Sequence, residues 1–585
     1  MEHNMILSAS GWRKVFAASG NEQDKTCNIT EESRAIAVVT ACVFFDYLKE
    51  TSKQESPVIA VGMDSRPTGP QIADAMLHAL VKKGAIIQFL GISSAPEIMA
   101  YAKKLDGFIY ISASHNPVGH NGIKFGTNDG GVLNADENAR VSKKFLEILS
   151  DDSKTQSLVS ECMNCKSSEL NQVYQVSESS KHNSLRAYED FVRETIASSK
   201  EKAEQEKFFN MIKNFALEHP IGVVCDFNGS SRHLCIDRSF FSQNNIHFNS
   251  INDSEIVHEI IPEAENLVHV AAQIELLQKQ GYKEYILGYM PDCDGDRGNI
   301  VYWDEKQKKA VILKAQEVFS LSVLAELTWC IWSAQGKDIK PAVAVNCPTS
   351  MRIEEIAQKL GATVFRAEVG EANVVNLARE KRAEGYTVPI LGEGSNGGTI
   401  TYPSSVRDPL NTVFALLKLL TLRDNGLFEL WCKKSGSKFN PDFTLADILK
   451  TLPVYTTTGV SDERAVLKVK TSDHQKLKAS FQKEFEADWK KRKPELEAKY
   501  GIFSYEAIIT NGTKETRNVT DFSLSKKGGL KILFKDKDEK PIAFIWMRGS
   551  GTEPVFRIMC DVKGDKKEEE KELLEWETKL IKKAD

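Results

Sequence analysis

The chain has 585 residues, of which 41% are hydrophobic and 27% charged, and its formal net charge is −5. This length is too great for one hydrophobic core and predicts roughly three to five domains. The composition is typical of a soluble globular protein. The slightly acidic balance gives no support for a nucleic-acid-binding surface, so we expect no nucleic-acid partner.

The sequence gives no sign of export or membrane insertion. The first residues, "MEHNMILSASGWRK", lack the apolar segment of a signal peptide, and the longest apolar run, "AIAVVTACVFF" (35–45), is shorter than the roughly 20 residues that span a bilayer. The 11 cysteines are an odd number scattered along the chain, which favours reduced thiols and a cytoplasmic location. Cys162 and Cys165 have CxxC spacing, but no second CxxC is present to complete a zinc site.

The first part of the chain alternates short apolar runs with amphipathic segments, which predicts an α/β fold. Residues 58–64 and 85–92 read as strands, residues 68–84 as the helix between them, and residues 107–114 as a further strand. The polar stretch from 150 to 184 is interpreted as a long surface excursion.

Two more α/β units are predicted, the second from "IGVVCDFNG" (221–229) and the third from "AVAVNCP" (342–348). Beyond residue 430 the pattern changes to a charged helical region at 473–501 and then to successive strands, expected to be antiparallel, at 530–564. We therefore expect four domains, with boundaries at residues 1–195, 196–311, 312–435 and 436–585.

Three aspartates follow an apolar run in "PDCDGDRGN" (291–299). Asp292, Asp294 and Asp296 alternate around a glycine, so their carboxylates can converge on one hard cation such as Mg²⁺. The glycine is misplaced for a calcium-binding EF-hand, and the glutamate of that motif is missing. A solvated acidic turn is the alternative, but carboxylates this close repel one another unless a cation or Arg297 compensates.

Two glycine-rich loops carry groups suited to a sugar phosphate. "MRGSGTEPVFR" (547–557) combines arginines, hydroxyls and a flexible backbone, which suits a phosphate dianion. The candidate residues in this loop are Arg548, Ser550, Gly551, Thr552 and Arg557. In "GEGSNGG" (392–398), Glu393 can accept hydrogen bonds from hydroxyl groups, and Ser395 can donate or accept them. Either loop taken alone also fits an ordinary turn.

Ser114 ends a strand-like run in "IYISASHNPVGHNGIK" (109–124), where Pro117 stops regular structure. Neighbours along a strand point to opposite faces, which argues on geometry against His115 as the proton acceptor for Ser114. No GxSxG elbow surrounds this serine. A serine, a metal loop and a phosphate-binding loop in one chain indicate phosphoryl transfer, with Lys124 able to approach the serine.

In this order, the four loops are similar to those of the α-D-phosphohexomutase family. "SASHNP" resembles its phosphoserine loop, "DCDGDR" its metal loop, "GEGSNG" its sugar-recognition loop and "RGSGTEP" its phosphate loop. The segments "SGWRK" (10–14), "VGMDSRP" (61–67) and "EVGEAN" (368–373) fit as well, so the resemblance covers nearly the whole chain.

The resemblance implies a fold and a reaction. The expected fold has three related mixed α/β domains and a C-terminal α+β domain, similar to the TATA-binding protein, around a central cleft. The expected reaction is reversible phosphate transfer between the C1 and C6 oxygens of a hexose through a bisphosphate. The implied cofactor is Mg²⁺, with glucose 1,6-bisphosphate as activator. The implied partner is a small sugar phosphate, and the implied state is a monomer or homodimer without a membrane partner.

The resemblance also implies roles for individual residues. Ser114 would carry the phosphate and, with Asp292, Asp294 and Asp296, provide metal ligands. His115 and Lys124 are candidates for proton transfer or charge stabilisation, and Arg13 and Arg297 would lie near the reacting phosphate. Glu393 and Ser395 would bind sugar hydroxyls. The phosphate that is not transferred would be bound by Arg548, Ser550, Gly551, Thr552 and Arg557.

The identity of the sugar depends on weaker features. Asn396, Gly397 and Glu371 depart from residues common in the family's recognition loops, whereas the phosphoryl-transfer residues are intact. The chain length is closer to the longer phosphoglucomutases than to compact phosphomannomutases, which favours glucose phosphates. The alternatives are a phosphomannomutase or dual-specificity mutase, a pentose or amino-sugar phosphate mutase, and a catalytically silent sugar-phosphate-binding regulator.

Overall fold

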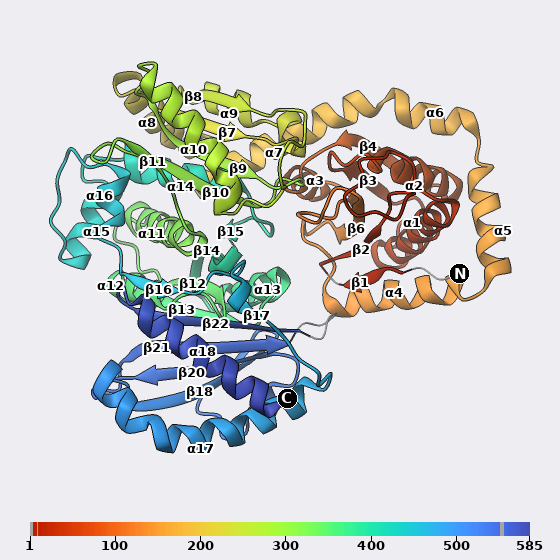
Figure 1. Ribbon diagram of the computed structural model, residues 1–585. Coiled ribbons are helices and arrows are strands. Elements are labelled where there is room, and N and C mark those ends of the chain that lie inside the picture. The colour runs from red at the N-terminus through yellow and green to blue at the C-terminus, as the bar shows by residue number, and fades with distance from the viewer. Residues whose placement is uncertain (1–3, 9, 397, 550–554) are drawn as a thin grey trace. The chain divides into compact units, whose positions relative to one another are not determined.

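The computed structural model describes residues 4–8, 10–396, 398–549 and 555–585, and Figure 1 shows their helices and strands. The chain divides into two compact units, which are described separately below. The first contains residues Met1–Leu313 and Pro403–Phe414, and the second contains Lys314–Tyr402 and Ala415–Asp585. Within the described residues, no helix is both long and apolar enough to cross a membrane.

The first unit begins with a six-stranded mixed sheet in the order β1-β2-β6-β5-β3-β4. Its strands are β1 (Ile6–Ser8), β2 (Gly11–Val15), β3 (Val58–Met63), β4 (Ile86–Ile92), β5 (Gly107–Ile111) and β6 (His120–Thr127). β3 runs parallel to β4 and β5, and β6 is antiparallel to β5. The core beside this sheet contains buried Trp12, whose ring centroid lies 5.0 Å from that of Phe125 and 4.7 Å from that of Phe145.

A second mixed sheet of the first unit has the order β11-β10-β9-β7-β8. Its strands are β7 (Gly222–Asp226), β8 (His247–Ile251), β9 (Tyr285–Pro291), β10 (Gly298–Asp304) and β11 (Lys309–Ile312). β7 is parallel to β8 and β9, and β10 is antiparallel to β9. The sheet therefore repeats the plan of the first sheet, in which a parallel centre ends in an antiparallel neighbour.

Helices surround these sheets. They are α1 (Glu31–Ser52), α2 (Gly69–Lys83), α3 (Ala95–Ala102), α4 (Ala135–Leu149), α5 (Asp152–Met163), α6 (Ser167–Gln175), α7 (Ser177–Ala197), α8 (Lys202–Glu218), α9 (Asp237–Gln243) and α10 (Ala264–Lys279). The stretch interpreted as a surface excursion, 150–184, is helical rather than irregular, since α5, α6 and the start of α7 occupy it (Figure 1). Its few buried side chains explain why hydrophobic spacing did not reveal the helices; one of them, Cys162, places its Sγ 3.6 Å from that of Cys42.

The second unit contains a four-stranded sheet in the order β13-β12-β14-β15. Its strands are β12 (Pro341–Asn346), β13 (Thr363–Ala367), β14 (Thr387–Glu393) and β15 (Gly398–Thr401). β12 is parallel to β13 and β14, and β15 is antiparallel to β14. Helices α11 (Ala315–Ser333), α12 (Arg352–Lys359) and α13 (Glu371–Ala383) belong to the same region. The bounds of the next helices are α14 (Pro409–Thr421), α15 (Leu427–Ser435) and α16 (Leu445–Leu449).

The C-terminal sheet is antiparallel, as the sequence predicts. Its strands are β16 (Tyr455–Thr457), β17 (Val466–Lys468), β18 (Ser504–Asn511), β19 (Lys514–Thr516), β20 (Gly529–Lys535), β21 (Pro541–Gly549) and β22 (Val555–Lys563). One face of this sheet contributes to a core with α17 (His474–Tyr500) and α18 (Lys567–Ala584). The mixed α/β class with a distinct C-terminal part is confirmed, and the four domain boundaries stay a prediction.

The three mixed sheets place their candidate loops at the same point. Ser114 lies between β5 and β6, the three aspartates between β9 and β10, and the 392–398 loop at the junction of β14 and β15. In each case the chain leaves a strand of the parallel centre and returns as its antiparallel neighbour. A short connection of this kind holds its side chains at one edge of a rigid sheet, which suits a functional loop.

Candidate active site

Ser114 lies in a turn and not at the end of an extended strand. Its φ is +54°, in the left-handed region that non-glycine residues seldom adopt. The Ser112 hydroxyl accepts a hydrogen bond from the Ser114 backbone nitrogen at 2.9 Å, which helps to hold this conformation. The turn brings Ser114 Oγ to 3.4 Å from His115 Nδ1, so the opposite-face argument drawn from strand geometry is wrong here.

Arg66 supports the Ser114 turn through contacts with its backbone. Arg66 Nη2 donates hydrogen bonds to the carbonyl oxygens of Ser114 at 2.7 Å and Asn116 at 2.6 Å. The Arg66 guanidinium is also paired with Asp64, and both side chains are fully buried. This buried, paired cation therefore holds the serine loop in place.

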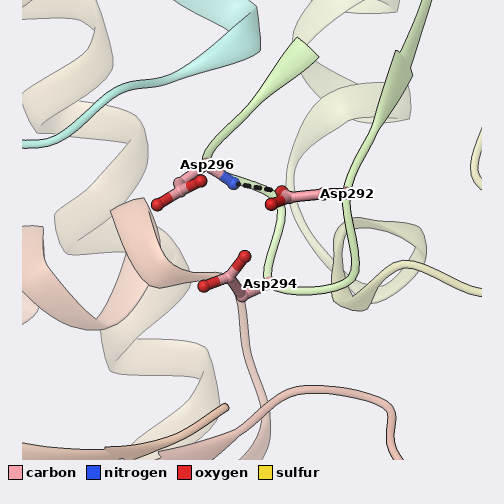
Figure 2. A group of neighbouring side chains, drawn as sticks. All are labelled: Asp292, Asp294 and Asp296. Carbon is pink, nitrogen blue, oxygen red and sulfur yellow. Dashed lines mark hydrogen bonds between the residues drawn. The ribbon is translucent and has the colours of Figure 1, made fainter. Parts of the chain in front are cut away.

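The three aspartates are buried and close together. Asp292 and Asp294 have no exposed surface and Asp296 is 3% exposed, and one carboxylate oxygen from each lies within 4.8 Å of the others. Figure 2 shows the three carboxylates around the β9–β10 turn, with the Asp296 backbone nitrogen donating to Asp292 Oδ1 at 3.2 Å. Ser114 Oγ donates a hydrogen bond to Asp292 Oδ2 at 2.9 Å. The serine predicted to react therefore touches the predicted metal cluster.

Two cations from distant parts of the chain, Lys124 and Arg407, and the neighbouring Arg297 lie beside this cluster. Lys124 Nζ lies 2.6 Å from Asp294 Oδ2 and 3.7 Å from Asp296 Oδ2. Arg407 Nη2 lies 2.8 Å from Asp296 Oδ2, and Arg297 Nε lies 3.9 Å from Asp292 Oδ2. These contacts offset part of the repulsion among three buried carboxylates.

Burial and neighbouring charges shift the pKa values of this site. The charge of Arg297, followed by burial and the charge of Arg13, lowers the pKa of His115 to about 2, so its imidazole is neutral. Burial and then the Asp294 and Asp296 carboxylates raise the pKa of Asp292 well above its ordinary value. Burial opposes the charge on Lys124, but the two carboxylates beside it raise its pKa, so the ammonium stays charged.

The aspartate cluster fits a divalent cation. Asp294 Oδ1 and Asp296 Oδ1 are buried and have no hydrogen-bond partner in the described part of the chain. Unpaired buried carboxylate oxygens are costly, and oxygen ligands are those that Mg²⁺ prefers. The donor set therefore suits Mg²⁺ chemically.

The sugar-loop residues lie in the second unit. Glu393 ends β14 and is 7% exposed; its Oε1 accepts hydrogen bonds from Asn346 Nδ2 at 3.0 Å and from the Gly370 backbone nitrogen at 2.8 Å. Ser395 follows in a short 3₁₀ turn and is 9% exposed. The β12 end and the start of α13 thus orient the glutamate.

The phosphate-loop residues are described in part. Arg548, near the end of β21, places its Nε 3.0 Å from Glu368 Oε1. Arg557 on β22 is the cross-strand partner of Arg548, so the two arginine side chains lie on the same face of the sheet. Ser550, Gly551 and Thr552 lie outside the described residues.

Two residues at this site carry no clear signal in the sequence. Arg66 lies in "VGMDSRP", a segment that fits the family without pointing to this arginine, and Arg407 lies in "SSVRDP", which has no recognisable spacing. Arg407 is separated from Asp296 by 111 residues, so only the fold brings them together. An Asp-x-Arg pattern directly after a strand, as at Asp64 and Arg66, could have indicated Arg66 as a site residue.

Comparison with known proteins gives a consistent family. Residues 9–152 match the description "Phosphoglucomutase/phosphomannomutase, alpha/beta/alpha domain I", and residues 324–434 match domain III of the same family. A phosphoglucomutase/phosphomannomutase of Thermococcus kodakarensis is 24% identical over 98% of this chain and 99% of its own length. A phosphoglucosamine mutase of Methanococcus aeolicus is 25% identical over 64% of this chain and 72% of its own.

Solved structures share the fold. The exocytosis-sensitive phosphoprotein pp63/parafusin of Paramecium, a phosphoglucomutase, aligns with a TM-score of 0.62 at 15% identity, covering 98% of this chain and 94% of its own. A phosphoglucomutase/phosphomannomutase family protein of Burkholderia thailandensis aligns with a TM-score of 0.61 at 16% identity, covering 99% and 97%. The matched domains, the full-length relative and this common fold agree: the chain contains phosphoglucomutase/phosphomannomutase domains I and III and resembles the α-D-phosphohexomutase family along its whole length.

Proposed function

We propose that the protein is a phosphoglucomutase that interconverts glucose 1-phosphate and glucose 6-phosphate through a phosphorylated Ser114 and a hexose 1,6-bisphosphate. The observation that carries the proposal is the 2.9 Å hydrogen bond from Ser114 Oγ to Asp292 within a buried cluster of three aspartates. A hydroxyl on an anionic, cation-binding cluster is suited to accept and return a phosphoryl group.

The reaction needs a balanced exchange of two bonds. A hydroxyl oxygen of the bound sugar monophosphate attacks the phosphorus on Ser114, the bond from phosphorus to Ser114 Oγ breaks, and a sugar bisphosphate results. In the second half, Ser114 Oγ attacks the other phosphate of the reoriented bisphosphate, the bond from that phosphorus to the sugar oxygen breaks, and the sugar monophosphate leaves with the proton that Ser114 gives up restored on its freed hydroxyl. Asp292, Asp294 and Asp296 would hold Mg²⁺, which when bound neutralises charge on the transferring group.

The surrounding side chains have separate tasks in this proposal. Lys124 is charged and stabilises the negative charge that develops on the reacting oxygens. His115 stays neutral and exchanges a hydrogen bond with Ser114 Oγ. Arg13 and Arg297 attract the reacting phosphate, and Arg407 and Arg66 position Asp296 and the Ser114 turn.

Recognition of the sugar phosphate is assigned to the second unit. Glu393 and Ser395 would accept or donate hydrogen bonds at sugar hydroxyls, while Arg548 with Ser550, Gly551, Thr552 and Arg557 would bind the phosphate that is not being transferred. An amino-sugar phosphate mutase is the second candidate, because a phosphoglucosamine mutase is among the relatives.

Side-by-side kinetics test the substrate assignment. We expect the highest kcat/KM on glucose 1-phosphate when glucose, mannose, glucosamine and ribose 1-phosphates are compared with Mg²⁺ and glucose 1,6-bisphosphate present. A higher kcat/KM on glucosamine 1-phosphate would change the assigned substrate from glucose to glucosamine phosphates and leave the proposed mechanism unchanged. No turnover of any of the four would contradict the proposal and favour a silent sugar-phosphate-binding protein.

A further inference from the structure

The second unit contains a cavity that the proposed reaction does not use. Its volume is about 750 Å³, within the usual range for small-molecule sites, and it lies between helix α12 and one face of the C-terminal sheet. Neither Glu393, Ser395 nor Arg548 belongs to the described residues that line it. The cavity is thus separate from the residues assigned to sugar-phosphate recognition.

The lining carries an excess of positive charge. Six lysine or arginine side chains and three glutamates line the cavity. The arginines are already engaged: Arg366 binds both oxygens of Glu354, and Arg517 binds both oxygens of Glu506. Two of the lysines are engaged as well, since Lys563 Nζ lies 2.6 Å from Glu355 Oε1 and Lys359 Nζ donates to the Ser435 carbonyl oxygen at 3.2 Å. The charge that remains to meet a ligand therefore comes mainly from Lys531 and Lys540.

Lys531 is the most unusual of these lysines. It lies on β20 between Leu530 and Ile532, which face the opposite core, and its side chain shares the cavity face with Leu533. Lys531 is 3% exposed, and its Nζ lies 4.3 Å from the centroid of the Phe544 ring. Apart from this ring contact, no hydrogen bond or ion pair to the Lys531 ammonium is found among the described residues.

A buried ammonium without a direct ion-pair partner is costly, and burial lowers the pKa of Lys531, as does nearby Arg366, while the more distant Glu354 and Glu515 carboxylates oppose the shift. Lys531 occupies an inward-facing strand position, where an apolar residue is usual. A lysine at such a position therefore indicates that an anionic ligand pairs with it. Lysine acts as a point charge and suits a compact anion such as phosphate, whereas a carboxylate is matched better by a forked arginine.

The remaining walls indicate what accompanies the anion. Ile508, Leu533 and Pro541 give the cavity an apolar side, and the volume leaves room for a body beyond the phosphate itself. We propose that this cavity is a binding site for a small organic phosphate with a flat apolar body, whose phosphate pairs with Lys531. Nucleoside monophosphates have this chemistry.

The site is joined to the sugar loop by a short chain of contacts. Arg366, which lines the cavity, donates from Nη1 to the carbonyl oxygens of Asn346 at 3.1 Å, Cys347 at 3.0 Å and Thr349 at 2.8 Å. Asn346 in turn donates to Glu393 Oε1 at 3.0 Å. A ligand that changes how Arg366 is held is therefore expected to act on the segment that orients Glu393.

Calorimetry with AMP as the probe tests the site without relying on enzyme activity. We expect AMP to bind, adenosine not to bind, and Lys531→Met to weaken AMP binding at least about tenfold, as loss of a charged hydrogen bond should. The matched control is Lys514→Met, which removes the same charge from an exposed position on the same sheet and should leave AMP binding unchanged. A titration with glucose 6-phosphate distinguishes this site from the catalytic site. Glucose 6-phosphate binding that is equal in the wild type and in Lys531→Met belongs to the catalytic site.

Two outcomes would overturn the proposal: no AMP binding to the wild-type protein, or equal AMP binding by Lys531→Met. Thermal unfolding without ligand separates a ligand-binding lysine from a structural one. If the ammonium has no ion-pair partner in the protein, Lys531→Met should keep or raise Tm. A lower Tm would count against the proposal. Hydrogen exchange at residues 346–349 and 391–395 should slow with AMP. Unchanged exchange there, with AMP bound, would refute the link to the sugar loop.

Discussion

In the first unit the three aspartates of the 292–296 turn are at most 3% exposed, whereas the side chain of Arg548 in the second unit remains 32% exposed. The aspartates lie against Ser114, Lys124 and Arg407, so charges of both signs are fixed before any ligand arrives. Among the described residues, Arg548 is paired with Glu368, and it shares its face with a second arginine. Under the proposed function, this difference means that the first unit is preorganised for chemistry, whereas the second leaves its charge available for a phosphate.

The largest effect is expected where the preorganised chemistry depends on one atom. Ser114→Ala should fold, because it removes only a hydroxyl, and should lose mutase activity on the order of 10³-fold or more in kcat. Ser112→Ala is the matched control, since it removes the hydroxyl that holds the turn and leaves the reacting one. We expect it to cost far less in kcat. If coupled-assay kinetics rank the two variants the other way, Ser114 is not the phosphate carrier.

Removal of Mg²⁺ should have a similarly large effect. Dialysis against EDTA should abolish turnover and added Mg²⁺ should restore it, because the aspartate cluster then lacks the charge that it is built to hold. Titration calorimetry gives an independent measurement: Mg²⁺ should bind the wild-type protein and bind Asp294→Asn much more weakly. Full activity after thorough chelation would contradict the metal assignment.

A smaller effect is expected in the second unit, because the proposed function assigns Arg548 to binding rather than to bond making. Arg548→Ala should weaken the binding of glucose 1-phosphate by about 2 kcal/mol or more, which appears as a higher KM. The circular dichroism spectrum of the variant should match that of the wild type. Arg492→Ala, which removes an arginine of α17 that belongs to neither proposed site, is the control. An unchanged kcat/KM for Arg548→Ala would remove this residue from the phosphate site.

Glu393→Ala should change sugar recognition and leave the phosphoserine intact. The loss of hydrogen bonds to sugar hydroxyls is expected to cost about 1–3 kcal/mol, seen mostly in KM. Phosphate content at Ser114, measured by mass spectrometry, should match that of the wild type. Identical KM and kcat on every hexose phosphate tested would exclude Glu393 from the site.

The smallest effect concerns stability rather than turnover, at the partly buried carboxyl of Glu263 in the first unit. Burial raises the pKa of Glu263 to about 7, although Arg297 opposes the shift. The unfolded chain then binds fewer protons than the folded one between about pH 4.5 and pH 7, so this group lowers stability as pH rises through that window. The unfolding free energy of Glu263→Gln minus that of the wild type should therefore be higher at pH 8 than at pH 5, by on the order of 1–3 kcal/mol. A pH-independent difference in urea denaturation would show that Glu263 titrates normally.

The sequence predicts this molecule unevenly. The aspartate loop could be inferred from spacing alone, because three carboxylates two residues apart in a glycine turn repel one another unless a cation balances them. The relation of Ser114 to His115 could not, because it depends on a positive φ that hydrophobic spacing does not report. The helices at 152–175 were missed for a related reason, since their polar sequence buries little.

Long-range partners were equally out of reach. Lys531 reads as an ordinary strand lysine until its neighbours across the sheet are known, and Arg407 has no motif that ties it to Asp296. Local pattern thus identified residues whose chemistry lies within one loop. Residues whose role depends on packing between separate elements needed the structure.

Peptide mass spectrometry of the wild-type protein after incubation with glucose 1,6-bisphosphate and Mg²⁺ tests the central claim most directly. The proposed mechanism predicts phosphate on Ser114, and its loss when glucose 6-phosphate is added, because the phosphoserine then returns its phosphate to the substrate. Phosphate found only at another residue, or a phosphate on Ser114 that glucose phosphates cannot remove, would contradict the mechanism.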